Sequence, residues 1–462
     1  MKRVCHVLLL TLASCTMGAD YIEPALELPK LWRAQPEAPA EAPAPPAAAQ
    51  WWKAFNDAQL DALVERALAH NQEVKIAELR ILEARAVKQE AASALYPQVE
   101  AEAKADRAKD QLIPGIPLLT KPMNTGEADI AAAWELDIFG GTQRRVEAAD
   151  ATSAAREADL RSVRLTLAGD VANNYIAWRQ LQQQEEFIRG IAEAQESSFK
   201  LIEKKREAGT ASRLQALQSQ SLYQATAARV PELERQRAAV GYGLSVLLGE
   251  PAGAVNDELQ PPQALPQPLA IPALAAPAEI IRRRPDVQAA ERELAAATAL
   301  QGAAIAELFP KLSLSALFGV QHISISTLST TSRVWSVGAD AAAPLLNFGR
   351  IEGQIAQADA RQLQAFQQYR RTVLAAFAEI ETALSNVAKE NRRIALLAAA
   401  SDSAAQALSL AYERYHRGIA SFLEVLAAEQ QYHASQSDLI AAQALRLSYL
   451  VNLYKAIGVP AA

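Results

Sequence analysis

Cysteine, methionine and positive charge are all scarce in this chain. Its 462 residues include two cysteines and three methionines, and 46 Lys and Arg against 52 Asp and Glu give a formal net charge of −6. An acidic chain of this kind does not suit nucleic acid as a partner. Beyond the N-terminus no run of about 18 apolar residues follows, so we expect no ordinary transmembrane helix. A membrane β-barrel gives a much weaker signal and is compatible with this composition.

Motifs of catalytic and metal sites are also missing. The sequence contains no His-Glu-x-x-His, no nucleophile elbow and no phosphate-binding glycine loop. Gly241-Tyr-Gly243 lacks the third glycine of a dinucleotide fingerprint, and the histidines do not have the spacing of metal ligands. We therefore predict that the protein is not an enzyme and has no catalytic residue, cofactor or metal.

The N-terminus has the organisation of an export signal. A basic start is followed by an apolar run from Val7 to Leu12 and by small residues up to Cys15. Leu12-Ala-Ser-Cys15 resembles the lipobox of bacterial lipoproteins, which implies that residues 1–14 are removed and that Cys15 is lipidated. Since Cys5 leaves with the signal, the mature chain cannot form an internal disulfide. An ordinary signal peptide with a chance cysteine is the alternative.

Two proline-rich segments divide the chain. The first lies within residues 15–50, has few core-forming residues, and suits an extended tether from the lipid to the folded body. The second, residues 251–277, contains seven prolines. We interpret it as the linker between two halves, residues 51–250 and 278–462.

The two halves share landmarks at a constant spacing. Gly140 and Gly349, which both follow Phe, are 209 residues apart, and so are Gly209 and Gly418. Upstream of Gly140 the spacing becomes 213 residues, so one half has a loop four residues longer. Agreement between separated landmarks indicates a tandem duplication.

Each repeat is predicted to contain one β-hairpin, at about residues 97–139 and 310–346. In both, helical periodicity stops at a proline and strict alternation follows. From Val99 to Asp106, for example, apolar residues alternate with Glu, Lys and Asp. Such a strand has one apolar and one polar face.

Long helices follow both hairpins. Apolar residues recur every seven positions from Phe366 to Ile394, which is typical of a coiled coil. We predict α-hairpins over about residues 141–248 and 349–457, with tips at Gly209 and Gly418, because glycine readily adopts the left-handed helix cap. The first helix would span about 65 residues, or about 100 Å, which exceeds the needs of a globular domain.

Four strands are too few to close a membrane barrel, whose smallest known form has about eight. Unpaired strand edges in lipid are costly, so we expect several chains to share one barrel. The predicted fold class is therefore mainly α with a membrane β-barrel part: a trimeric 12-stranded barrel, with apolar faces toward lipid and a polar lumen, continued by a long α-helical coiled-coil barrel. In the alternative, the hairpins cover the helical core of a soluble protein.

Segments that cover nearly the whole mature chain from Trp51 carry a family resemblance. They are Trp52 to Asp61, Ala67 to Asn71, Trp134 to Gly140, Arg283 to Val287, Ala290-Glu291, Phe309-Pro310, Leu345 to Gly349, Arg417-Gly418 and Glu424 to Leu426. The chain resembles the outer-membrane factor family, the TolC-like channels, and more closely its lipidated OprM-like and NodT-type branch. The resemblance implies a lipid-anchored homotrimer in the cell outer membrane with a periplasmic helical tunnel. Implied partners are a periplasmic adaptor protein and an inner-membrane pump of the resistance-nodulation-division type.

The resemblance also implies roles for the hairpin tips. Gly209, Thr210, Gly418 and Ile419 would dock onto the adaptor. The residues expected to hold the periplasmic mouth closed are Tyr412, Arg414, Tyr415, Arg417 and Glu424. Relatives often carry an acidic residue where this chain has Ala420, so we expect Glu424, or bonds from Tyr415 and Arg417, to substitute for it. Simple solvation of a loop is the alternative role for these side chains.

The predicted function is the outer-membrane channel of a tripartite efflux system that passively exports small toxic compounds or drugs. Its energy would come from the partners. Within the channel class, protein secretion by a one-step exporter is the main alternative. Outside it, the alternative is a lipid-anchored structural coiled-coil protein without a pore.

Overall fold

The computed structural model describes residues 16–25, 27–34, 48–109, 122–268, 274–325 and 327–458. The predicted signal, Cys15 and most of the proline-rich tether lie outside these residues. The chain divides into two compact units. The sheet unit comprises Met1–Ala25, Leu79–Glu157 and Ala289–Arg371, and the helical unit comprises Leu26–Glu78, Ala158–Gln288 and Thr372–Ala462. Both sequence halves contribute to each unit.

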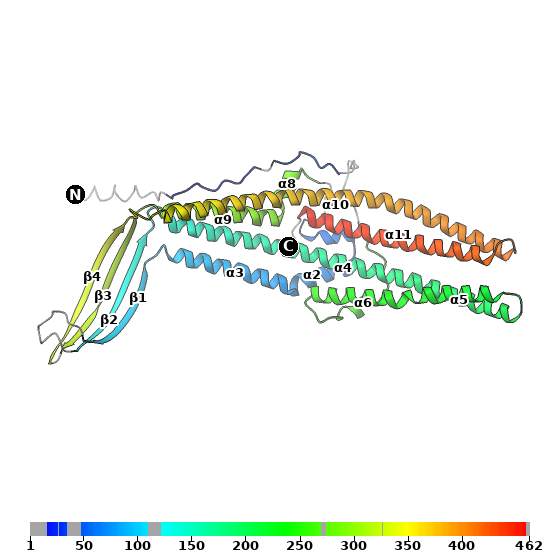
Figure 1. Ribbon diagram of the computed structural model, residues 1–462, viewed down its shortest axis with the longest axis horizontal. Coiled ribbons are helices and arrows are strands. Elements are labelled where there is room, and N and C mark those ends of the chain that lie inside the picture. The colour runs from blue at the N-terminus through cyan, green and yellow to red at the C-terminus, as the bar shows by residue number, and fades with distance from the viewer. Residues whose placement is uncertain are drawn as a thin grey trace. The chain divides into compact units, whose positions relative to one another are not determined.

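The elements follow the same order in both halves of the chain. The first half contains η1 Ala48–Phe55, α2 Ala58–His70, α3 Gln72–Ser93, β1 Gln98–Ala108, β2 Met123–Leu136, α4 Gly141–Glu207, α5 Arg213–Ala227 and α6 Arg229–Leu247 (Figure 1). The second contains α7 Asn256–Leu259, α8 Pro277–Arg283, α9 Pro285–Ala306, β3 Lys311–Ile325, β4 Leu328–Ala342, α10 Arg350–His416 and α11 Phe422–Ile457. The predicted fold class, mainly helical with antiparallel β-hairpins, is confirmed.

The four strands form one antiparallel sheet in the order β1-β2-β3-β4 (Figure 1). Its register places Ala101 beside Ile130, Ile130 beside Phe318, and Phe318 beside Trp335. Because side chains alternate between faces, these residues form an apolar row across one face. Ile130, Phe318 and Trp335 are 56%, 62% and 74% exposed. A single chain thus leaves large apolar side chains of the sheet open to the surroundings.

The opposite face of the sheet carries charged and amide side chains. Glu102 lies beside Asp129, and Lys104 lies beside Glu127. The amide of Gln321 donates a hydrogen bond of 2.6 Å to Glu127 on the neighbouring strand. The predicted alternation therefore gives the sheet one apolar and one polar face.

The segment between β2 and α4 contains Asp137 and Phe139, and both residues have structural roles. The two carboxylate oxygens of Asp137 accept hydrogen bonds from the N–H groups of Thr142 (3.0 Å) and Gln143 (2.6 Å). These N–H groups in the first turn of α4 have no partner within the helix. The ring of Phe139 stacks on Phe309 at 4.8 Å, which joins the corner between β2 and α4 in the first repeat to the corner between α9 and β3 in the second.

A buried arginine on α4 holds the helical unit together. Arg179 is 1% exposed and donates to the main-chain carbonyls of Leu259 (3.1 Å) and Pro261 (2.9 Å). One turn earlier, the hydroxyl of Tyr175 donates to Asp57 at 2.8 Å. These bonds attach the start of α2 and the proline-rich linker to α4.

The Arg-Arg-Pro-Asp segment has a similar role at the start of α9. Arg284 is buried, forms ion pairs with Asp286 (2.8 Å) and Glu379 (2.7 Å), and donates to the carbonyl of Ala456. Pro285 opens α9, where a missing N–H costs nothing. The motif therefore fixes α8 and α9 against α10 and α11.

The described residues that follow Cys15 pack onto helices. In the sheet unit, the N–H of Met17 donates to the carbonyl of Phe139 at 3.1 Å, and Arg144 pairs with Asp20 at 2.8 Å. In the helical unit, Trp32 stacks on Phe377 at 5.3 Å. From the sequence we predict an extended tether here, and the contacts with the folded body are not foreseen. Single residues in a proline-rich segment do not form a periodic pattern, so nothing in the sequence indicates that they pack against helices.

The returning helix of the first repeat is two helices, whereas we predicted one. α5 ends at Ala227 and α6 begins at Arg229. Pro231 has no N–H to donate to the carbonyl four residues earlier, so it interrupts the helix. In the second repeat, α11 runs without interruption from Phe422 to Ile457.

The hydropathy of α10 is higher than the lack of an apolar run suggested. α10 contains an 18-residue window of mean hydropathy 1.4, long and apolar enough to cross a membrane by length and composition alone. An average over a window lets alanine and leucine outweigh occasional polar residues, whereas an unbroken apolar run is absent from this helix. Of this window 11% is buried, whereas the heptad positions Val373, Ile380 and Val387 of α10 are 6%, 0% and 2% exposed.

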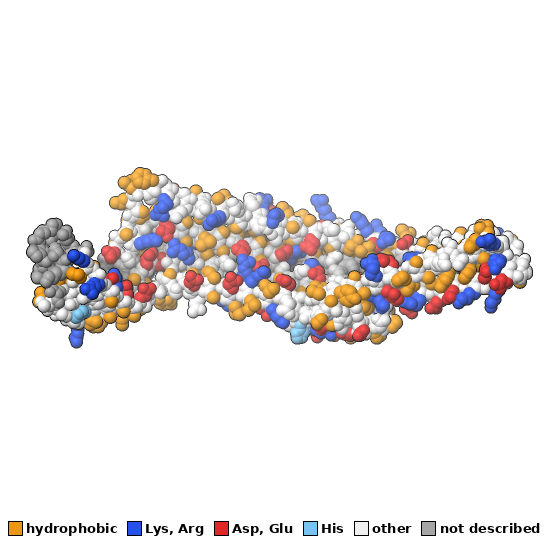
Figure 2. Space-filling model, turned by 60° about the horizontal axis from the view of Figure 1, so that its bottom comes forward, with side chains coloured by type: hydrophobic (Ala, Val, Ile, Leu, Met, Phe, Trp, Pro, Cys, Tyr) orange, Lys and Arg blue, Asp and Glu red, His pale blue; other side chains and the backbone are white. Residues whose placement is uncertain are grey.

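Charged residues of both signs cover the helices. On the face shown in Figure 2, blue basic and red acidic side chains alternate along the helical parts of the chain. Several are neighbours on one helix, such as Lys200 and Glu196 at 2.7 Å. Such exposed pairs contribute little to stability, and their mixture of signs is typical of a surface that faces water.

Candidate functional site at the hairpin tips

The turn between α4 and α5 is a helix cap built around a glycine. Gly209 has φ +75°, and its N–H donates to the carbonyl of Arg206 at 3.0 Å. The N–H of Thr210 donates to the carbonyl of Lys205 at 2.8 Å. This pair of bonds is the Schellman motif, which satisfies the last carbonyls of α4. No atom lies within 4 Å of a Cβ added to Gly209, so a larger side chain would have room. Glycine is required because of the positive φ, which other residues rarely adopt.

The turn between α10 and α11 repeats this arrangement. Gly418 has φ +72°, and its N–H donates to the carbonyl of Tyr415 at 2.9 Å. The N–H of Ile419 donates to the carbonyl of Arg414, also at 2.9 Å. The two predicted tip glycines therefore serve the same local purpose in the two repeats.

A side-chain cap starts each returning helix. The N–H of Ser212 donates to Gln215 at 2.9 Å, and the N–H of Ser421 donates to Glu424 at 3.2 Å. Each tip therefore combines a left-handed glycine with a capping box. Glu424, a predicted gate residue, stabilises the start of α11 in this conformation.

The two tips share one apolar cluster, which we call the tip cluster. It consists of Ile202, Ala216, Phe422 and Val425, which are all less than 9% exposed. The α4–α5 and α10–α11 turns accordingly lie at the same end of the helical unit (Figure 1). The ring of Tyr415 packs against this cluster, with its centroid 5.6 Å from that of Phe422. Movement of one hairpin away from the other would therefore expose apolar surface.

A buried acid lies one turn above the tip cluster. The carboxylate of Glu429, which is 9% exposed, accepts a hydrogen bond from the hydroxyl of Tyr412 across α10 and α11. Burial raises the pKa of Glu429, and it also raises the pKa of Tyr412. Sequence reasoning predicted Tyr412 but missed Glu429. The sequence does contain a pattern that points to Glu429. Phe422, Val425 and Glu429 occupy one helical stripe, and Glu429 is the charged residue among two apolar ones.

The predicted arginines lie at the surface of the tip. Arg414 is 3.9 Å from Glu424 on the facing helix, whereas Arg417 is 3.8 Å from Glu413 on its own helix. All four side chains are at least half exposed, so both pairs are weak. The structure thus brings Arg414 and Glu424 together and leaves Arg417 free to meet another molecule.

We expect Gly418→Ala to loosen the second tip, because an L-residue in the left-handed region costs about 1 kcal/mol or more. Hydrogen exchange of the Ile419 amide should become about fivefold faster. Gly353→Ala is the matched control, since Gly353 lies within α10, does not have a positive φ, and has nothing within 4 Å of an added Cβ. Equal exchange at Ile419 in both variants would contradict the requirement for glycine.

We also expect Glu429→Gln to change how stability depends on pH. A carboxyl group whose folded pKa is raised stabilises the fold at low pH, and this contribution is lost as pH rises through the folded pKa. His433, whose pKa is lowered by burial, acts in the opposite sense, so the comparison is made between the variant and the wild type at each pH. From about pH 4.5 to about pH 8, the stability of Glu429→Gln relative to wild type should rise by about 1 kcal/mol. Thermal unfolding followed by circular dichroism measures this difference, and a constant difference would show that Glu429 does not titrate in this range.

Comparison with known proteins identifies the family. The model of the outer membrane efflux protein family matches residues 63–250 and 276–459. The pyoverdine export outer membrane protein OpmQ of Pseudomonas aeruginosa is 31% identical over 454 residues, which cover 97% of this chain and 94% of OpmQ. Nodulation protein T of Rhizobium leguminosarum bv. viciae is 30% identical over 440 residues, which cover 94% of this chain and 89% of that protein.

Solved structures agree with this assignment. The outer-membrane channel OprN superimposes with a TM-score of 0.87 at 32% identity, over 96% of this chain and 99% of that one. The resemblance to outer-membrane factor channels, and to the NodT-type branch in particular, is thereby confirmed. The chain belongs to the outer membrane efflux protein family and is an efflux channel of the outer membrane.

Proposed function

We propose that three copies of this chain form one channel, with a twelve-stranded β-barrel in the outer membrane and a coiled-coil helical barrel in the periplasm. The observation that carries the proposal is the four-stranded sheet with two open edges and one exposed apolar face. Unpaired backbone groups in lipid cost several kcal/mol each, so a lone sheet of this kind is not stable in a membrane.

Closure of the barrel follows from the strand order. β1 and β4 are the two edges of the sheet and run antiparallel to each other, so β4 of one copy can pair with β1 of the next. Three such junctions remove every edge. The row that contains Ile130, Phe318 and Trp335 then meets lipid, and the face with Glu102, Asp129 and Lys104 lines a water-filled lumen.

Lipid attached to Cys15 anchors each chain after removal of residues 1–14. Thr16 and Met17 follow Cys15 directly, and the N–H of Met17 is bonded to Phe139, three residues after the end of β2. The anchor thus begins beside the end of a membrane strand, where a lipid chain can reach the bilayer. In the mature chain, the linker 251–277 joins repeats 51–250 and 278–462. The match of the family model to two separate stretches, residues 63–250 and 276–459, supports this division.

The hairpin tips dock onto a periplasmic adaptor, which couples the channel to an inner-membrane pump of the resistance-nodulation-division type. Around Gly209, Thr210 and Gly418, the tips present apolar side chains to solvent: Leu214, Ile419 and Leu423 are 62%, 65% and 55% exposed. Such side chains suit a helical partner. Neither nucleotide-binding nor catalytic motifs are found in the sequence, so energy comes from the partners.

The transported compounds are small and toxic to the cell. Relatives carry names that refer to pyoverdine, solvents, toluene and cations, so the family scaffold is compatible with chemically unrelated small molecules. The channel itself performs no chemistry. It supplies a continuous polar path, and selection of the compound takes place largely in the partners.

The assembly is tested by native mass spectrometry of the protein extracted gently from the outer membrane. We expect three copies, each lacking residues 1–14 and carrying acyl mass. Cys15→Ala is the matched control and should lose the acyl mass. A monomer that retains lipid would refute the shared barrel and favour a structural lipoprotein, whereas trimers without acyl mass would refute only the anchor.

The periplasmic mouth is held closed by Tyr412, Arg414, Tyr415, Arg417 and Glu424. Tyr415 packs against the tip cluster, to which both hairpins contribute, and Arg414 faces Glu424 within the second hairpin, so the closed state uses these contacts. Within the part of the chain that the structure describes, Arg417 pairs with Glu413 of its own helix alone, so it is available to a neighbouring copy. These contacts replace the acidic residue absent at Ala420.

Arg417→Ala should therefore open the mouth. In planar bilayers we expect basal conductance to rise several-fold, and cells that carry the variant should become sensitive to large antibiotics that are normally excluded. Arg392→Ala, which removes an exposed arginine of α10 far from the tip in sequence, is the matched control. If the two variants conduct alike and leave sensitivity unchanged, Arg417 is not part of the gate.

A further inference from the structure

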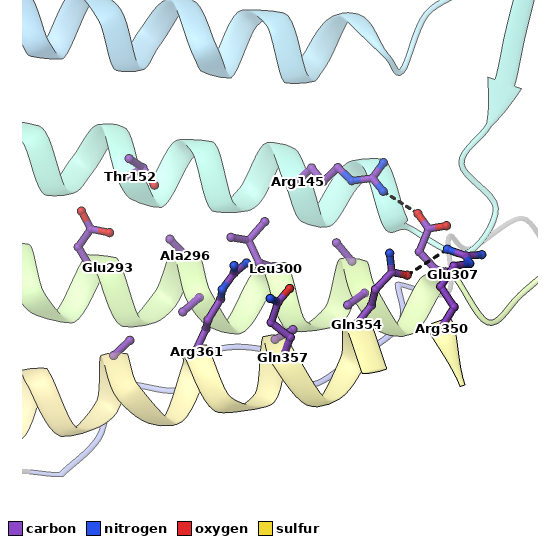
Figure 3. Close-up of a pocket in the computed structure, with 15 residues that line it drawn as sticks. Arg145, Thr152, Glu293, Ala296, Leu300, Glu307, Arg350, Gln354, Gln357 and Arg361 are labelled. Atoms are coloured by element: carbon purple, nitrogen blue, oxygen red, sulfur yellow. Dashed lines mark hydrogen bonds and ion pairs between the residues drawn. The ribbon is translucent and has the colours of Figure 1, made fainter. Parts of the chain in front are cut away.

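The sheet unit contains a groove between α9 and α10, beside the start of α4 (Figure 3). Its volume is about 580 Å³, within the range of roughly 300–1,000 Å³ found for sites of drug-sized ligands. The apolar part of its lining consists of Leu300 and small side chains, among them Ala296, Ala297, Ala303 and Ala304. Such a surface allows a flat apolar group to lie close to the helices.

Charged side chains line the same groove, and the carboxylates among them are already paired. Arg145 is 2.7 Å from Glu307, which is also 3.0 Å from Lys311. Glu293 is 3.0 Å from Arg156. The acids of the groove are therefore neutralised by basic residues, and they do not make it a site for cations.

Two arginines of the groove have no such compensation. Arg350 donates to the amide oxygen of Gln354 at 3.3 Å, and within the described part of the chain no carboxylate is within 4 Å of either Arg350 or Arg361. Figure 3 shows Arg361 and Gln357 rising from α10 beside α9. The groove thus combines two uncompensated guanidinium groups with amide donors and an apolar floor.

The direction in which the groove opens follows from the N-terminal residues. On α9, the side of Arg292 and Gly302 faces them: the guanidinium of Arg292 lies 5.7 Å from the ring of Tyr21, and a Cβ on Gly302 would be 2.7 Å from the carbonyl of Met17. Leu300 projects from the side of the helix opposite Gly302, because two residues turn an α-helix by about 200°. A segment that leads to lipid lies outside the tunnel, so in the proposed channel the groove opens into the lumen.

We propose that this groove binds amphiphilic organic anions on their way through the channel. An aromatic sulfonate or carboxylate fits, with its anionic group on Arg361 and Arg350, which present planar forks of donors, and its ring on the alanines. Gln354 and Gln357 supply further donors. The inference rests on the proposed function only for the lumenal position of the groove, and not for the binding itself.

Equilibrium dialysis with naphthalene-2-sulfonate tests the site, using the full-length protein in lipid nanodiscs and empty nanodiscs as the blank. We expect binding above the blank, about tenfold weaker in Arg361→Gln, since loss of a charge-assisted hydrogen bond has about this effect. Arg371→Gln is the matched control, because it removes the same charge from an exposed position on α10 that does not line the groove. The neutral 2-naphthylmethanol should bind wild type as weakly as the sulfonate binds Arg361→Gln.

Arg350→Gln provides a second variant in case Arg361→Gln disturbs folding. Binding at the blank level, or equal binding by wild type, Arg361→Gln and Arg371→Gln, would overturn the proposal. The proposal would also be overturned if Arg361→Gln lost its trimers while wild type bound no sulfonate. That result would mean that a second copy of the chain, and not an anion, occupies the groove. Native mass spectrometry of the same samples separates the two proposals: trimers without binding refute the anion site alone, whereas a monomer with Arg361-dependent binding refutes the channel assembly alone.

Discussion

The four-stranded sheet has two open edges and one exposed apolar face. Backbone groups along β1 and β4 need partners, and the exposed row of Ile130, Phe318 and Trp335 needs an apolar environment. In the proposed channel, further copies of the same sheet, surrounded by lipid, satisfy both needs.

The two repeats share the same turn structure at their hairpin tips, but their returning helices differ. Gly209 and Gly418 adopt the same left-handed conformation and form the same pair of cap hydrogen bonds. The helices that return from them differ, because Pro231 interrupts the first and nothing interrupts the second. Only the second hairpin carries the buried pair of Tyr412 and Glu429. The first hairpin supplies Ile202 and Ala216 to the tip cluster against which the second hairpin packs.

Polar groups buried in the helical unit specify how distant segments meet. Arg179 is satisfied by carbonyls of the linker, and Arg284 by acids on α9 and α10 together with a carbonyl of α11. Each arginine is costly to bury unless all of these partners are in place, so alternative packings of the helices are disfavoured. The proline-rich linker consequently takes part in the core and does more than connect two halves.

Local patterns in the sequence specify the elements of this protein: alternation from Val99 to Asp106 specifies a strand, heptads from Phe366 to Ile394 specify a long helix, and Gly209 and Gly418 specify the turns of the two α-hairpins. These signals are local, because each reports the environment of one element. Which side chains meet depends on how the elements pack, as in the bond of Tyr412 to Glu429, the stacking of Trp32 on Phe377, and the groove with Arg350 and Arg361. Such contacts join residues that are far apart in the chain or on different elements, and periodicity along one element carries no information about the partner across the gap.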